Sequence, residues 1–196
     1  LRENYEKYYA VTDEKFRKDE FEKKVPNEFR IKTKGIEVGH IFHFGQKYST
    51  PMNANVNTDD GKSTPVFMGS YGVGISRLVG AVIEANHDEK GIIWPKQIAP
   101  WNYNIINLKK GDQDCDAACL KLYNLMNENY DSVLYDDTYE RAGAKLARAD
   151  LIGLPYQIII GPNGVKDQLF DLKIRKNGEI TKLSYNELLN FIKINT

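Results

Sequence analysis

Hydrophobic and polar positions follow two different patterns along the chain, and the change falls near residue 100. In the first half, residues 35–50 are mostly apolar with partial alternation, which predicts a strand. The Asp-Gly pair within Thr58–Lys62 favours a hairpin turn, so residues 65–71 are predicted to form the return strand. Apolar residues then recur at helical spacing over Leu78–Ile83, which predicts a buried helix after a buried strand.

Beyond residue 100, short apolar runs alternate with amphipathic stretches, as in α/β folds. The strands predicted here are 103–108, 132–135, 156–160, 169–175 and 179–183. Helices are predicted after Asp112, over 143–152 and after Ser184, because Asp and Ser are good N-caps and Gly153 can close the middle helix. An Asn-Gly turn joins the last two strands. The second half is therefore predicted to be a small α/β domain with a mixed sheet.

The remaining segments suggest where the domains begin and end. Residues 1–34 are rich in charge and tyrosine, which predicts a solvated surface with a marginal helix around 12–24. The segment 91–104 carries two prolines and two tryptophans, and this composition predicts a stiff linker. We place the boundary near Pro100, which gives domains of residues 1–100 and 101–196.

Composition narrows the classes of function. The chain has 27 basic and 27 acidic side chains, so its whole surface is not built for nucleic acid, although a local basic patch is possible. No apolar run reaches the roughly 20 residues of a membrane span, and the charged start has no signal-peptide pattern, so a cytoplasmic location is expected. Cys115 and Cys119 are predicted to be reduced, partly buried thiols, and no metal site is expected.

The glycine-rich turn at Gly72–Arg77 is the strongest candidate for chemistry. Gly72 and Gly74 lack Cβ atoms, so a ligand or another backbone can come close. Arg77 is the one charge in this apolar run, and a guanidinium can stack on a planar ring while donating to phosphate. The alternative is a tight strand-to-helix connection whose arginine points to solvent.

Three neighbouring stretches together carry a family resemblance. They read GIEVGHIFHFGQKYS at 35–49, MGSYGVGISRLVGA at 68–81 and HDEKGIIWPKQIAP at 87–100. They resemble the third signature motif of class II aminoacyl-tRNA synthetases and its flanks, as found in bacterial-type prolyl-tRNA synthetases. The resemblance implies the last part of an antiparallel catalytic domain, followed by a small α/β anticodon-binding domain.

The resemblance also implies roles for individual residues. Arg77, the expected catalytic residue, would stack on adenine and contact the γ-phosphate of ATP. The ATP-binding positions implied are Glu37, Val38, Gly39, His40, Gly72, Gly74 and Arg77. Phe42 and Ser70 would face the small pocket for proline. For His40, Phe42 and Glu37 the alternatives are, in turn, a strand histidine, a core residue and a plain edge charge.

The first two signature motifs of the family are not visible in this sequence. Arg30 is followed by Ile31 where the second motif has an acidic residue. The chain is therefore expected to be the C-terminal part of a longer ATP-dependent proline–tRNA ligase, which would use Mg²⁺ and form a homodimer. This chain alone is not expected to be active. No separate editing domain is expected immediately before Gly35.

The second half carries the family's anticodon signature after its second strand, at 136–155. Arg141 and Lys145 could read guanine edges, and Glu140 could accept from a base amino group of proline tRNA. Ala142 stands where the family has proline, and Arg148 where it has an acidic or polar residue. The alternative is a charged helix N-terminus in solvent.

Two other functions compete with the ligase. A synthetase-like RNA-binding module or accessory protein would lack aminoacylation, but such proteins tend to lose the arginine that is intact here as Arg77. A sister synthetase for threonine would need a set of Cys and His zinc ligands, and none is visible. One for histidine has a different strand before the third motif.

Overall fold

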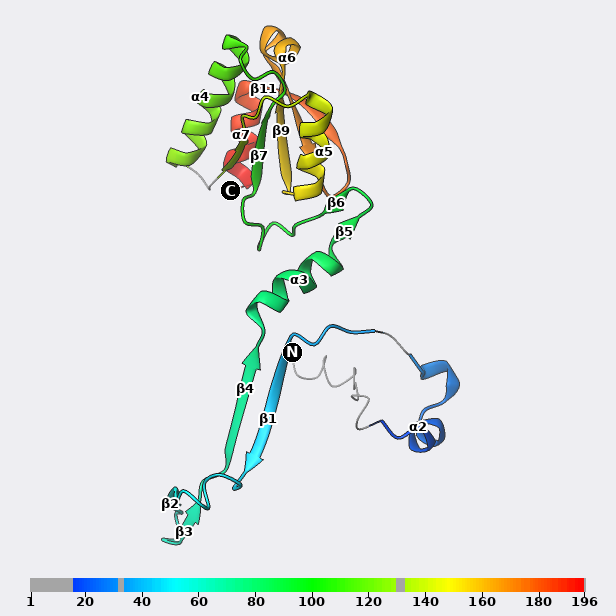
Figure 1. Cartoon of the computed structure of the whole chain (residues 1–196), viewed down its shortest axis with the longest axis vertical. Coiled ribbons are helices and arrows are strands. Elements are labelled where there is room, and N and C mark those ends of the chain that lie inside the picture. The colour runs from blue at the N-terminus through cyan, green and yellow to red at the C-terminus, as the bar shows by residue number, and fades with distance from the viewer. Residues whose placement is uncertain (1–15, 32–33, 130–132, 196) are drawn as a thin grey trace. The chain divides into compact units, whose positions relative to one another are not determined.

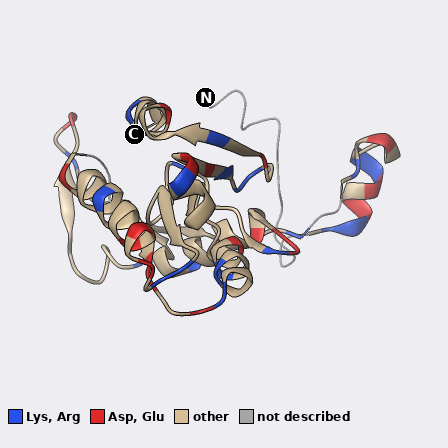
Figure 2. Ribbon diagram, turned by 90° about the horizontal axis from the view of Figure 1, so that it is seen from above, with Lys and Arg blue, Asp and Glu red and all other residues tan. Residues whose placement is uncertain are grey.

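The computed structural model describes residues 16–31, 34–129 and 133–195 of the chain, which divide into a unit up to Glu37 and a unit from Val38 onward. In the first unit, α2 (Lys18–Lys24) precedes a 3₁₀ turn, η2 (Asn27–Phe29). Lys and Glu pair at i,i+4 on α2, and Figure 2 shows both signs of charge along it. The predicted helix is confirmed from Lys18; residues 12–15 lie outside the described residues.

An antiparallel hairpin opens the second unit. Strand β1 (Gly39–Gly45) pairs with β4 (Met68–Val73), and a smaller hairpin, β2 (Asn55–Asn57) with β3 (Ser63–Pro65), lies between them in sequence. The Asp-Gly turn is confirmed, because Thr58 donates its N–H to Lys62 O at 2.8 Å. The long strand predicted over 35–50 is wrong before residue 39 and beyond residue 45. Gly45 has φ +56°, and the β1–β4 register shifts between His43 and Gly45.

Helix α3 (Ile75–Ala85) follows β4, as predicted, and leads to the short pair β5 (His87–Asp88) and β6 (Gly91–Ile92). The prediction that this strand and helix are buried is wrong. No residue of α3 is buried, and Tyr71 is 83% exposed. The reason is that β1 and β4 form a sheet of two strands, and a lone hairpin has too few neighbours to enclose its side chains.

A five-stranded mixed sheet forms the centre of the second half, in the order β11-β10-β9-β7-β8. Its strands are β7 (Tyr103–Asn107), β8 (Val133–Asp136), β9 (Tyr156–Ile160), β10 (Leu169–Ile174) and β11 (Ile180–Ser184). β7 pairs in parallel with β8 and β9, while β10 is antiparallel to β9 and β11. The predicted mixed sheet is confirmed.

Helices cover both faces of this sheet (Figure 1). Side chains of α4 (Gln113–Asn129) and α7 (Tyr185–Asn195) join the larger core cluster, whereas α5 (Ala142–Ile152) packs Ala149 against Ile106 and Ile159. A short helix that the sequence did not predict, α6 (Pro162–Asp167), begins with proline at its first turn. Cys115 and Cys119 are free thiols, as predicted, but both are fully buried.

The predicted helix ends are confirmed by their hydrogen bonds. Asp112 accepts from the Cys115 N–H at 3.2 Å at the start of α4, and Ser184 and Glu187 exchange hydrogen bonds at the start of α7. Gly153 ends α5 with φ +77°. Across the described residues, none of the helices is long and apolar enough to cross a membrane.

The segment that follows α3 packs closely on α5 and on Arg175, the residue after β10. Trp94 donates its N–H to Gly153 O at 3.0 Å, and a Cβ on Gly153 would lie 1.8 Å from Ile92 O. The Arg175 guanidinium, 4% exposed at its side chain, donates to both carboxylate oxygens of Asp88 at 2.6 and 2.8 Å. The predicted linker is therefore fixed to the α/β domain, and the boundary near Pro100 stays a prediction.

Candidate functional site

The first group of predicted site residues lies on the β1–β4 hairpin. The register places His40 opposite Gly72 and Phe42 opposite Ser70, so these four residues share one antiparallel sheet. The prediction that this sheet extends through Arg77 is wrong, because β4 ends at Val73 and Arg77 lies on α3. The rings of His40 and Phe42 stack at 4.3 Å with an interplanar angle of 6°. Phe42 is 43% exposed, so among the described residues the side chain predicted to face proline belongs to an open aromatic surface and not to the core.

The glycines of the turn allow close backbone approach. A Cβ on Gly39 would lie 2.9 Å from Gly72 O, so a larger residue would push the two strands apart. Gly74 donates its N–H to Val38 O at 3.0 Å and caps α3. The close approach to Gly72 O explains the glycine at position 39, whereas nothing lies within 4 Å of a Cβ on Gly72.

Arg77 lies on the first turn of α3 and is exposed. A Cβ on Gly74 would lie 3.2 Å from the Arg77 Cβ, so glycine leaves this arginine room to move. Glu37 is exposed and ends the other unit, so the hairpin brings together the expected ATP-binding positions from Val38 onward. Arg77 can offer a planar cation, and the stacked rings of His40 and Phe42 can offer a flat apolar surface.

The second group of predicted residues lies where β8 ends and α5 begins. Arg148 on α5 donates to Asp136 Oδ2 at 2.7 Å and to Glu140 Oε2 at 2.6 Å. Thr138 accepts from Arg148 at 2.8 Å and donates to Asp136 Oδ1 at 2.8 Å. Burial opposes ionisation of Asp136, but the hydrogen bonds from Arg148 and Thr138 outweigh it and lower its pKa. The same hydrogen bond to Asp136 raises the pKa of Arg148.

Lys145 differs from the prediction that it lies on an exposed face with Glu140 and Arg141. Its side chain is 0% exposed, and Nζ donates to Asn107 O at 2.5 Å and lies 3.8 Å from Asp136 Oδ1. The reason is its position on α5, since residues 145 and 149 lie one turn apart and both face the sheet. The signal available in the sequence was the i,i+4 spacing of Lys145 and Ala149, which puts the lysine on the same helix face as the small apolar residue.

Arg141 and Glu140 do lie exposed at the N-terminal end of α5, as predicted. Arg141 is the N-cap residue, and its carbonyl accepts from the N–H groups of Ala144 and Lys145. Within the described residues its guanidinium forms no hydrogen bond or ion pair. Glu140 uses Oε2 for Arg148. An accessible guanidinium beside a fixed carboxylate can donate to, and accept from, a planar base.

Asn104 is a residue of this region that the sequence analysis missed. It is 2% exposed in the middle of an apolar strand, on the α5 side of β7. Its Oδ1 is buried and has no hydrogen-bond partner among the described residues. The signal in the sequence was one polar residue inside the apolar run 103–106. No group of three or more His, Cys, Asp or Glu side chains that could hold a metal occurs in the described part of the chain.

Comparison with known proteins agrees with this architecture. Residues 103–195 match the anticodon binding domain family, which covers the whole five-stranded sheet. The crystal structure of prolyl-tRNA synthetase from Cryptosporidium parvum, complexed with L-proline and AMP, matches with a TM-score of 0.68 at 20% identity. That match covers 81% of this chain and 33% of the other, and it supports the fold. The sheet and its helices thus form an anticodon binding domain.

Sequence relatives identify the particular family. The chain is 54% identical over 176 residues to the proline–tRNA ligase of Maricaulis maris, covering 90% of this chain and 39% of the relative. It is 51% identical over 189 residues to that of Rhodospirillum rubrum, covering 96% of this chain and 43% of the relative. The chain belongs to the proline–tRNA ligase family, and it spans about two-fifths of the length of these relatives.

Proposed function

We propose that this chain is the C-terminal part of an enzyme that activates L-proline with ATP and transfers it to proline tRNA. One observation carries the proposal: a glycine-rich strand-to-helix turn with Arg77 precedes an anticodon binding domain in a chain 54% identical to a proline–tRNA ligase. The rest of the active site, the homodimer and the cytoplasmic location are parts of the same proposal and stay predictions.

In the proposed reaction, the carboxylate of proline attacks the α-phosphate of ATP and pyrophosphate leaves. The hairpin would contribute mainly position and charge to this step. Arg77 would lie on adenine and donate to the γ-phosphate, while Gly72 and Gly74 form the floor below the nucleotide. Val38, Gly39 and His40 would line it along β1, with Glu37 beside them.

Phe42 and Ser70 would form the wall against the proline ring. Their positions support this role, because they are opposite each other in the register and Phe42 presents an open ring. A proline ring needs an apolar wall of limited size together with an anion for its ammonium group.

The described residues do not fit a protein-held Mg²⁺ site, because no cluster of three possible ligands occurs, so no step is assigned to a metal.

The α/β domain would bind the anticodon through the N-terminal end of α5. Arg141 would donate to a guanine edge and Glu140 would accept from a base amino group, because both are exposed there. Lys145 is buried, so it would not touch a base; its hydrogen bond to Asn107 O and its closeness to Asp136 would only hold this end of the sheet in place. Splayed single-stranded bases suit such reading by side chains.

Binding of proline tRNA to the purified chain tests this function. Arg141→Ala is expected to cost about 1–3 kcal/mol with proline tRNA and less with an anticodon-swapped tRNA. Lys193→Ala is the matched control, an exposed basic residue on α7. Measuring both tRNAs at two salt concentrations separates base contacts from phosphate contacts, because only the loss of a phosphate contact reduces the salt dependence of binding. Equal binding of both tRNAs by wild type and Arg141→Ala would refute the anticodon assignment.

Activity of the complete ligase separates an enzyme from a binding module. If the family's whole enzyme carries these residues, proline-dependent exchange of pyrophosphate into ATP should fall when Arg77 is replaced. An accessory RNA-binding protein would bind tRNA through the α/β domain and show no exchange that depends on Arg77.

A further inference from the structure

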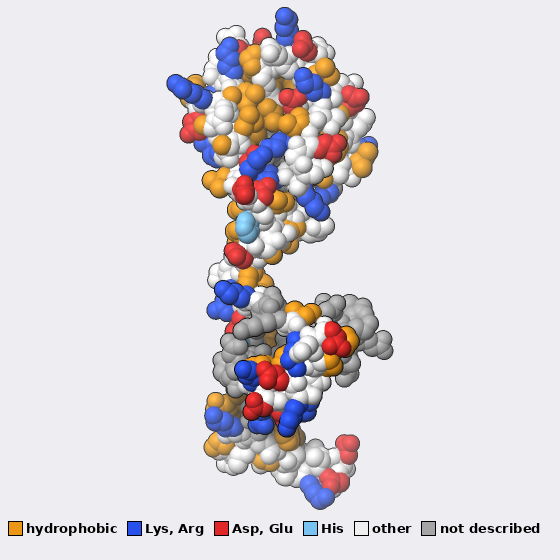
Figure 3. All heavy atoms as spheres, turned by 90° about the vertical axis from the view of Figure 1, so that its right-hand side faces the viewer, with side chains coloured by type: hydrophobic (Ala, Val, Ile, Leu, Met, Phe, Trp, Pro, Cys, Tyr) orange, Lys and Arg blue, Asp and Glu red, His pale blue; other side chains and the backbone are white. Residues whose placement is uncertain are grey.

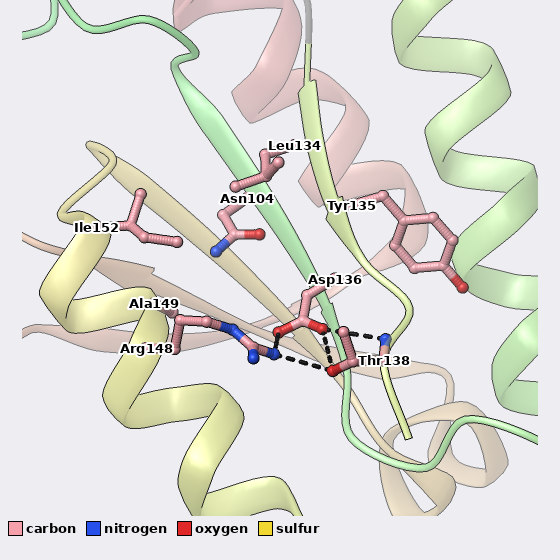
Figure 4. Close-up of a pocket in the computed structure, with 8 residues that line it drawn as sticks. All are labelled: Asn104, Leu134, Tyr135, Asp136, Thr138, Arg148, Ala149 and Ile152. Atoms are coloured by element: carbon pink, nitrogen blue, oxygen red, sulfur yellow. Dashed lines mark hydrogen bonds and ion pairs between the residues drawn. The ribbon is translucent and has the colours of Figure 1, made fainter. Parts of the chain in front are cut away.

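A cavity of about 170 Å³ opens between α5 and the edge strand β8 of the anticodon binding domain. The residues that line it come from three elements and one loop: Asn104, Leu134, Tyr135, Asp136, Thr138, Arg148, Ala149 and Ile152. In Figure 4 the Asn104 side chain points into the space between Ile152 on α5 and Leu134 on β8. The cluster of Asp136, Thr138 and Arg148 lies at one end of that space.

The floor of the cavity is an unsatisfied amide. Asn104 is 2% exposed, and its Oδ1 has no hydrogen-bond partner in the described part of the chain. A buried amide without a partner is unfavourable, and natural proteins keep few of them without a reason. The side chain carries a donor and an acceptor next to each other, between apolar walls. That combination suits a planar partner with a complementary donor and acceptor on one edge.

The charges around the cavity indicate that this partner is neutral. Arg148 is shared between Asp136 and Glu140, and the buried Lys145 lies 3.8 Å from Asp136. These four side chains formally cancel, so the mouth of the cavity has no excess positive charge for a phosphate. On the face of the molecule seen in Figure 3, acidic and basic side chains are interspersed.

We propose that this cavity takes one nucleobase of an RNA loop, and that Asn104 reads the edge of that base through its amide. The inference rests on the proposed tRNA binding and adds a base-reading residue to it. An asparagine amide can pair with a base edge that offers a neighbouring donor and acceptor, and Leu134 and Ile152 can contact the faces of the ring. Glu140 is bonded to Arg148, which lines the cavity, and Arg141 follows it as the N-cap of α5, so adjacent bases could reach these two residues while one base enters the cavity.

The test measures binding of the proline tRNA anticodon stem-loop to the full chain. Asn104→Leu keeps the side-chain size and removes the amide, and it is expected to weaken binding at least tenfold. Its melting temperature should stay the same or rise, because an unpaired buried amide is replaced by an apolar group. Loss of binding without loss of stability is the signature that a merely structural asparagine would not give. Asn190→Leu, an exposed site on α7, is the matched control and should bind normally.

Replacing the anticodon bases one at a time identifies the base that enters. One replacement should weaken binding to wild type and have no further effect on Asn104→Leu, because the two changes remove the same contact. Asn104→Asp, which exchanges the amide donor for an acceptor, should change the base preferred at that position only. If Asn104→Leu does not fold, Asn104→Ser provides the same comparison in a smaller side chain.

Each result decides the question. Normal stem-loop binding by a folded Asn104→Leu or Asn104→Ser overturns the inference, and the cavity is then only a hydrated gap. If Arg141→Ala weakens binding in the same assay, the proposed function survives that failure; if neither variant has an effect, both are wrong. Free adenosine, guanosine, cytidine and uridine form the other arm. Binding of one of them as tightly as the stem-loop, with the same loss in Asn104→Leu, would make the ligand a free nucleoside and overturn the RNA assignment.

Discussion

The contact between the segment after α3 and the α/β domain depends on two glycines: Gly91 lies against the backbone of Leu151, and Gly153 lies against the backbone of Ile92. A Cβ on Gly91 would lie 2.4 Å from Leu151 Cα, and one on Gly153 would lie 1.8 Å from Ile92 O. Both obstructing atoms are backbone, so no side-chain rotation can relieve either clash. We therefore expect Gly153→Ala to detach this segment or to destabilise the domain.

Gly178 offers a matched control for this substitution. Gly153 has φ +77° and Gly178 has φ +73°, but nothing lies within 4 Å of a Cβ on Gly178. Gly178→Ala should cost only the left-handed backbone conformation of alanine, about 1–2 kcal/mol. Gly153→Ala adds about 1–3 kcal/mol for overpacking and about 1 kcal/mol for the hydrogen bond from the Trp94 N–H to Gly153 O, which is 3.0 Å long.

Thermal unfolding of the two variants measures the difference. The additional cost of Gly153→Ala is at least about 2 kcal/mol, which corresponds to a melting temperature at least about 8 °C below that of Gly178→Ala for a domain of this size. Far-ultraviolet circular dichroism follows the domain, and tryptophan fluorescence reports whether Trp94 becomes exposed. Equal melting temperatures with unchanged fluorescence would show that the Ile92 backbone yields at no cost, and the packing argument would be wrong.

Three further predictions concern the thiols, a helix cap and the arginine of the glycine-rich turn. Burial raises the pKa of Cys115 to about 11 and of Cys119 to about 12, so the folded chain should resist a thiol reagent at pH 8 that labels both thiols after unfolding. The free energy of unfolding should fall as pH rises above about 9, because only the unfolded thiols ionise there. Fast labelling of the native chain would contradict this. Ser184→Ala removes the cap bonded to Glu187 and should lower the free energy of unfolding by about 1 kcal/mol in urea titrations, whereas an unchanged midpoint would mean that α7 needs no cap. In a complete ligase, Arg77→Ala should raise the barrier for ATP use by about 2–4 kcal/mol, and an unchanged rate at limiting ATP would show that this arginine is only a surface charge.

Much of the α/β domain could be predicted because local signals and tertiary packing agree there. The runs at 103–108 and 156–160 are rich in isoleucine, and both became central strands of the sheet. Capping residues predicted the starts of α4 and α7, and Gly153 predicted the end of α5, since these bonds form within one turn of the helix.

The hairpin half was harder to predict, because periodicity records only which residues are apolar. Ile41 and Tyr71 are each 83% exposed, although the sequence around them resembles a buried strand. Exposure depends on how many other layers cover a strand, and that number is not written in the strand itself. The β5–β6 pair was missed for a related reason: each strand has two residues, too few for any periodic signal.

The sequence by itself determined the family, the mixed sheet, the glycine-rich turn with Arg77 and the region of the anticodon signature. Tertiary structure alone decided which charges remain available there. Lys145 and Arg148 lie three residues apart on one helix, yet the sheet buries the first beneath Asn107 O while the second pairs with Asp136 and Glu140. Only the packing of α5 against β7 and β8 places Asn104 at the floor of a cavity. The physical reason is that burial and pairing depend on neighbours distant in sequence, whereas caps, turns and strand propensity depend on adjacent residues.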